Sequence, residues 1–75
     1  MNYKRVSVVW QDAALNNGWM ESHKSAGLRS VETTGFLIYK DDEVVKVALT
    51  LDHDSGCFAD VLCVPRQWCR KIRYL

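Results

Sequence analysis

The sequence lacks most of the features that mark linkers, membrane spans and export signals. It has one proline in 75 residues and no run of the roughly 18 apolar residues that a membrane-spanning helix needs. Its opening, MNYKRVSVVW, has no apolar core of roughly 7 to 15 residues such as a secretion signal carries. We therefore expect a single domain over residues 1–75, located in the cytoplasm and without a membrane partner.

Paired cysteines are also missing. The three cysteines, Cys57, Cys63 and Cys69, are odd in number and contain no Cys-x-x-Cys pair. This pattern favours reduced thiols over a disulfide framework. Their spacing from His53 does not match a zinc finger, so we expect no metal and no cofactor.

The chain has almost no net charge. A formal charge of +1 and a pI near 7.7 give no overall field for a polyanion, so any nucleic-acid binding requires a local basic patch. The last stretch, VPRQWCRKIRYL, is rich in arginine and lysine and contains no acidic residue. It is either such a patch or the charged edge of a sheet.

The size of the chain predicts marginal stability. At 75 residues, folding buries only roughly 60 to 65% of the unfolded surface, and small domains of this kind often gain stability by association. A hydrophobic fraction of 48% suffices for a small core and a subunit interface. We expect a homo-oligomer.

Alternating apolar residues predict five β-strands. Four of them are KRVSVVW, VETTGFLIYK, EVVKVALTLD and CFADVLCV, and a last one follows the turn PRQW, with Ile72 and Tyr74 on one face and Lys71 and Arg73 on the other. The aspartates of KDDE and HDSG predict tight turns. Pro65 cannot donate to a sheet ladder and should end the fourth strand.

Residues 11–30 show neither the two-residue period of a strand nor the period of a helix. They predict a long loop with one helical turn from Asp12 to Leu15, capped by Asp12. The expected fold is all-β: a five-stranded barrel of the SH3 or Sm-like type, with this loop after the first strand and a one-turn helix before the fifth. Closing the sheet limits its exposed edges. The alternative is an α+β fold in which the segment from Asp12 to Ser30 is a helix packed on the sheet.

Three stretches, VVWQDAALNNGWM, TTGFLIYKDDEVVKVAL and VPRQWCRKIRYL, resemble small accessory proteins of bacteriophages and prophages. Phe36 stands where such proteins are expected to have tryptophan. The resemblance implies a phage protein that acts in the host cytoplasm. It brings no catalytic residues with it.

The long loop is the first candidate binding site. Trp19 offers a stacking face, Lys24 and Arg29 offer phosphate contacts, and Gly18 and Gly27 permit close backbone approach. Together with the phage resemblance, these residues suggest an oligomeric anti-defence protein that sequesters a small nucleotide signal. The alternative role for the loop is a lid that buries Trp19.

Two further functions compete with nucleotide capture. In the first, Trp68, Arg70 and Tyr74 form an interface that binds and inhibits a host protein. In the second, a small barrel binds single-stranded nucleic acid through its aromatic and basic residues, although Trp10 and Trp68 suit core positions equally well.

Catalysis is not expected. His53 and Cys57 flank the turn HDSG, but no motif pairs them as a nucleophile and its base. The same stretch lacks the third oxygen ligand and the closing glutamate of a calcium loop, so its aspartates are expected to serve the turn.

Overall fold

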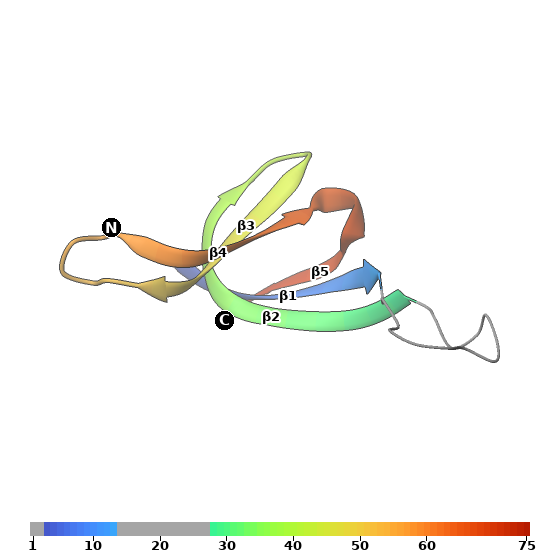
Figure 1. Cartoon of the computed structure of the whole chain (residues 1–75), viewed down its shortest axis with the longest axis horizontal. Helices are drawn as coiled ribbons and strands as arrows, with labels where there is room; N and C mark the ends of the chain where they lie inside the picture. The colour runs from blue at the N-terminus through green and yellow to red at the C-terminus, as the bar shows by residue number, and fades with distance from the viewer. Residues whose placement is uncertain (1–2, 14–27) are drawn as a thin grey trace, which may run out of the picture.

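The computed structural model describes residues 3–13 and 28–75, which form five strands and a one-turn 3-10 helix. The prediction of an all-β chain with a short helix before its last strand is confirmed for these residues. In chain order the elements are β1 (Lys4–Ala13), β2 (Leu28–Lys40), β3 (Val44–Leu51), β4 (Phe58–Pro65), η2 (Arg66–Trp68) and β5 (Cys69–Tyr74) (Figure 1).

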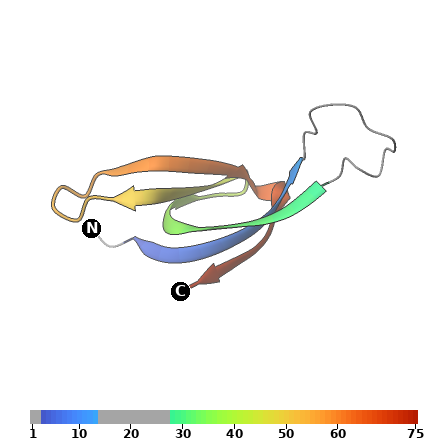
Figure 2. The same ribbon diagram turned by 60° about the horizontal axis from the view of Figure 1, so that its bottom comes forward.

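The strands form one antiparallel sheet in the order β4-β3-β2-β1-β5. Strands β1 to β4 follow one another as a meander, and η2 leads the chain back so that β5 lies beside β1. The sheet curls strongly, as the bent path of β2 in Figure 2 shows. Strands β4 and β5 form its two edges, so in the described part of the chain the sheet is not closed by strand pairing.

The first connection differs from its predicted bounds. β1 and β2 pair without interruption from Lys4 opposite Leu37 to Ala13 opposite Leu28. The predicted helical turn at Asp12 is therefore wrong, because Asp12 pairs with Arg29 in this ladder. Cross-strand hydrogen bonds outweigh the local capping preference of one aspartate. Residues 12–13 and 28–30 lie in strands, which also contradicts a helix running from Asp12 to Ser30. Residues 14–27 lie outside the described residues.

The core is small and made mainly of valine. Trp10, Leu37, Cys69 and Ile72 pack partly buried around it. The alternation along β3 predicts that Val45, Val47, Leu49 and Leu51 share one face. Val45 and Val47 are fully buried, but Leu49 is 54% exposed. The pairing of β3 with β2 ends at Ala48, so beyond that point β3 pairs with β4 alone. The fully buried apolar residues are Val6, Val8, Val45, Val47, Ala48 and Val64.

Gly35 lies next to Phe36, where the pairing of β2 with β3 begins. A Cβ atom at this position would lie 2.5 Å from the carbonyl oxygen of Ala48 and 2.7 Å from Cγ1 of Val47. Only a residue without a side chain allows β2 to approach β3 this closely while it also pairs with β1 at Val6.

The aspartate turns form as predicted. Asp52 accepts hydrogen bonds from the amide of Asp54 and from the hydroxyl of Ser55, both at 2.9 Å. Between β2 and β3, Asp41 accepts hydrogen bonds from the amides of Glu43 and Val44. These side-chain bonds add to the backbone hydrogen bonds that already close both turns. Across residues 3–13 and 28–75, no helix has the length and apolar character needed to cross a lipid bilayer.

Candidate functional site

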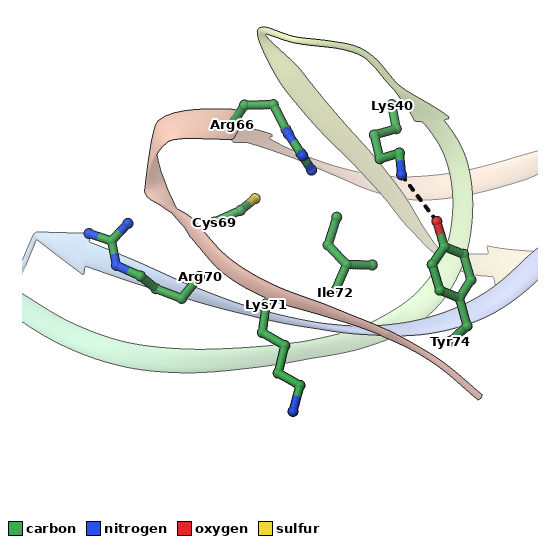
Figure 3. Close-up of a pocket in the computed structure, with 7 residues that line it drawn as sticks. All are labelled: Lys40, Arg66, Cys69, Arg70, Lys71, Ile72 and Tyr74. Atoms are coloured by element: carbon green, nitrogen blue, oxygen red, sulfur yellow. Dashed lines mark hydrogen bonds between the residues drawn. The ribbon is translucent and has the colours of Figure 1, made fainter.

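An open groove of about 260 Å³ lies between β5, η2 and the end of β2 (Figure 3). Four of its lining residues are basic and none is acidic. Cys69 and Ile72 form an apolar floor between Arg66 on one side and Lys40 with Tyr74 on the other. The complete lining is Lys40, Arg66, Cys69, Arg70, Lys71, Ile72 and Tyr74.

A β-bulge in β2 brings Lys40 to this groove. Leu37 pairs with Val47 in one register, whereas Tyr39 and Lys40 pair with β3 in a register shifted by one residue. The extra residue, Ile38, reverses the alternation, so Lys40 lies opposite the buried Val45. Without the bulge, the side chain of Lys40 would point to the other face of the sheet.

A second bulge shapes the floor. Val9 pairs with Lys71 but Trp10 pairs with Cys69, which leaves Arg70 as the extra residue of β5. Cys69 and Ile72 therefore share the core-facing side although they are three residues apart. Arg70 remains at the rim, where its guanidinium donates to the carbonyl of Gln67 at 3.0 Å and to the side-chain oxygen of Gln11.

Arg66 is positioned by the turn between β2 and β3. Its backbone amide donates to the carbonyl of Glu43 at 2.7 Å. That turn is held by Asp41, whose carboxylate accepts the amides of Glu43 and Val44 at 2.8 Å each and the hydroxyl of Tyr39 at 2.6 Å. The bond from Tyr39, followed by those from the two amides, lowers the pKa of Asp41, so this acid stays ionised at neutral pH. Asp41 thus orders the segment that carries Lys40 and anchors Arg66.

Tyr74 closes one end of the groove. Its hydroxyl accepts a hydrogen bond from Nζ of Lys40 at 3.2 Å, and that nitrogen is 5.8 Å from the ring centroid. Because the hydroxyl lies at the edge of the ring, this hydrogen bond holds the ammonium group of Lys40 near that edge. Nζ of Lys4 lies 5.7 Å from the same centroid. Tyr74 is 49% exposed, so its ring is accessible to a ligand.

The groove cations are not neutralised by carboxylates within the described ranges. The ion pair found there joins Arg73 to Glu32 at 3.4 Å and lies outside the groove lining. Lys71 lines the groove, but its ammonium group points away from the other side chains in Figure 3. Lys40 and Arg66 therefore provide the inward-facing charge, and Arg70 adds charge at the rim.

The thiol of Cys69 lies close enough to these cations for them to affect its pKa. Burial raises the pKa of its thiol, while the neighbouring guanidinium groups of Arg66 and Arg70 act in the opposite direction. Cys57 and Cys63 are exposed free thiols, so their replacement by serine isolates Cys69 as the reactive group.

We expect Arg66→Gln to move the pH profile of Cys69 alkylation to higher pH in a Cys57→Ser, Cys63→Ser background. Removing the cation takes away a favourable interaction with the thiolate, so a higher pH is needed to form it. Iodoacetamide labelling rates measured across pH separate this shift from a change in access, which scales all rates equally. Lys46→Gln serves as the charge-matched control, since Lys46 does not line the groove.

The predicted site residues are only partly brought together. Trp19 and Lys24 lie outside the described residues. Arg29 is an exposed residue of β2 and does not line the groove. Arg70 and Tyr74, predicted as interface residues, do line it. Trp68 lies in η2 with 40% of its surface exposed, so it is not a core residue.

Lys40 was missed because its alternation along β2 points it outwards until the bulge is known.

No metal-binding group of His, Cys, Asp or Glu occurs in the part of the chain that the structure describes. His53 packs edge-on against Phe36 with centroids 6.4 Å apart, while Cys57 is exposed in the turn.

Comparison of the chain with protein-family models, with curated proteins and with solved structures finds no match. The groove itself is therefore the basis for assigning a function.

Proposed function

We propose that the protein is a non-enzymatic binding protein whose groove holds a phosphate-bearing ligand of the nucleotide type. The observation that carries this proposal is the placement of Lys40, Arg66 and Arg70 around an apolar floor that no acidic side chain lines. Lysine ammonium and arginine guanidinium groups are the preferred protein partners of phosphate oxygens. The exposed ring of Tyr74 supplies a surface for a base.

The acidic turn that borders the groove favours one orientation of the bound ligand. Glu43 contacts η2 through its backbone, and Asp41 remains ionised beside Lys40. These carboxylates disfavour a phosphate placed against the turn. The more favourable position for the phosphate is over the apolar floor between Arg66 and Lys40, with the base towards the ring of Tyr74.

The strand order and the helical turn before β5 support a small-barrel architecture of the SH3 or Sm-like type, with the groove along its open side. Phage origin, oligomerisation and a role as an anti-defence nucleotide sponge stay predictions from the sequence. The loop residues Trp19, Lys24 and Arg29 stay a second proposed contact surface for the same ligand.

We expect AMP and cyclic nucleotides to bind, and adenosine, which lacks the phosphate, to bind at least tenfold more weakly. Arg66→Gln and Lys40→Gln should each weaken nucleotide binding by about tenfold, because each removes a charge-assisted hydrogen bond. Isothermal titration calorimetry gives the affinities, and native mass spectrometry of the same samples gives the subunit number and the ligand ratio.

Lys46→Gln is the control for loss of one positive charge and should bind as the unmodified chain does. Equal affinity for AMP and adenosine, or unchanged binding by both groove variants, would show that the groove does not recognise phosphate. If binding is lost only in the variant that combines Trp19→Ala with Arg29→Ala, the site lies in the loop instead.

A further inference from the structure

The groove is smaller than an enclosing ligand pocket and is open along β5. Pockets that enclose drug-sized ligands measure about 300 to 1,000 Å³, and this groove measures about 260 Å³. Tyr74 lies at one end of β5, and Trp68 precedes its other end, each with more than a third of its surface exposed. A groove of this size holds one nucleotide unit and leaves the rest of a longer ligand outside.

β5 offers a continuous path for such a ligand. It has six residues, which at about 3.3 Å per residue span about 20 Å. Its one partner strand in the described sheet is β1, so its other edge retains free backbone groups. Arg66 and Arg70 contribute charge near the Trp68 end, and Lys40 and Lys4 contribute charge at Tyr74.

Charge along β5 differs from that on the opposite edge of the sheet. β5 contains Arg70, Lys71 and Arg73 and no acid. β4 contains Asp60 and no basic residue, and the turn before it contains Asp52 and Asp54. The near-zero net charge therefore conceals a basic edge and an acidic edge, and a polyanion is directed to the first of these.

From this arrangement the geometry points to single-stranded nucleic acid as the ligand, lying along β5 with its phosphates at the groove cations and a base on Tyr74. This inference rests on the proposed phosphate-binding function and specifies its ligand class. Single-strand binding commonly combines a basic track with aromatic stacking faces, and RNA and DNA share the groups involved.

Edge protection is the competing explanation for basic residues on an outer strand. It accounts for Lys71 and Arg73, which alternate outward. It does not account for Lys40 or Arg66, which belong to other elements and reach into the groove (Figure 3). The two bulges that direct Lys40 and Cys69 inward build a site that edge protection does not require.

The test compares thymidine monophosphate with dT4, dT8 and rU8 by fluorescence anisotropy competition against a labelled dT8. We expect dT8 and rU8 to bind at least tenfold more tightly than the monophosphate. Four cations are expected to contact phosphate, namely Arg66, Arg70, Lys40 and Lys4. The slope of log affinity against log salt should therefore be about −3, and Arg66→Gln should reduce the magnitude of this slope by about 0.7. Tyr74→Leu should weaken dT8 binding by about tenfold, whereas Tyr74→Phe should retain it.

Equal affinities for the monophosphate and dT8 would overturn the inference of single-stranded nucleic-acid binding and leave the proposed function standing. Failure of the monophosphate and of all the oligonucleotides to bind would overturn both. Tight dT8 binding that is unchanged in both Arg66→Gln and Tyr74→Leu would also overturn the inference, because it would place the oligonucleotide on another surface. Urea unfolding of each variant confirms that the protein compared is folded.

Discussion

Gly35→Ala should lower the free energy of unfolding by about 3 kcal/mol. The added methyl group would lie 2.5 Å from the carbonyl oxygen of Ala48 and 2.7 Å from Cγ1 of Val47. The first neighbour is backbone, and it belongs to the β2 and β3 pairing that joins Phe36 to Ala48. Relief of the clash therefore requires the two strands to separate at the centre of the sheet.

The expected loss is large for so short a chain. Domains have roughly 0.05 to 0.15 kcal/mol of stability per residue, which gives roughly 4 to 11 kcal/mol for a chain of this length. Urea unfolding followed by circular dichroism measures the change. A destabilisation below about 1 kcal/mol would show that β2 does not approach β3 this closely.

Gly56→Ala is the matched control for this substitution. Gly56 has a φ of +78°, and an added Cβ would meet no atom within 4 Å. The cost there is the backbone strain of a left-handed conformation, about 1 kcal/mol. The difference between the two variants isolates the steric contact at Gly35 from the general loss of a glycine.

The strands were predictable because their alternation is local and strong. The valines of β1 and β3 repeat every second residue, and the aspartates mark the turns, so both elements could be located from the sequence. The extension of β1 through Asp12 and Ala13 could not. It depends on cross-strand partners at Leu28 and Arg29, which a single segment does not reveal.

The groove was less accessible to sequence analysis than the fold. The sequence predicts Arg70 and Tyr74 as interface residues but not Lys40, because alternation alone assigns the side chain of Lys40 to the wrong face. The bulge at Ile38 corrects this, and it arises from the register between β2 and β3. A bulge inserts one residue without a distinctive composition, so its position follows from pairing and not from local preference.

The same irregularities connect stability to binding. The bulge in β5 places Cys69 on the core side, where it packs with Trp10 and forms the groove floor. The indole of Trp10 is held by a hydrogen bond to the hydroxyl of Thr33 at 3.1 Å. The groove is thus built on the rim of the hydrophobic core, and changes that loosen this rim are expected to affect both properties.

Val64→Ala should lower the free energy of unfolding by about 2 to 3 kcal/mol, since it removes buried methyl groups and leaves a cavity. Val64 is 1% exposed and pairs with the buried Val45. Val61→Ala makes the same chemical change on the same strand at a position that is 43% exposed, and it should cost less than about 1 kcal/mol. Both variants lose the same strand preference, so the difference in their urea unfolding free energies reports burial alone. Equal losses at the two positions would mean that an additional surface covers Val61 in solution, as the predicted homo-oligomer would do if β4 formed its interface, and dilution of the protein would then reduce the loss at Val61 but not at Val64.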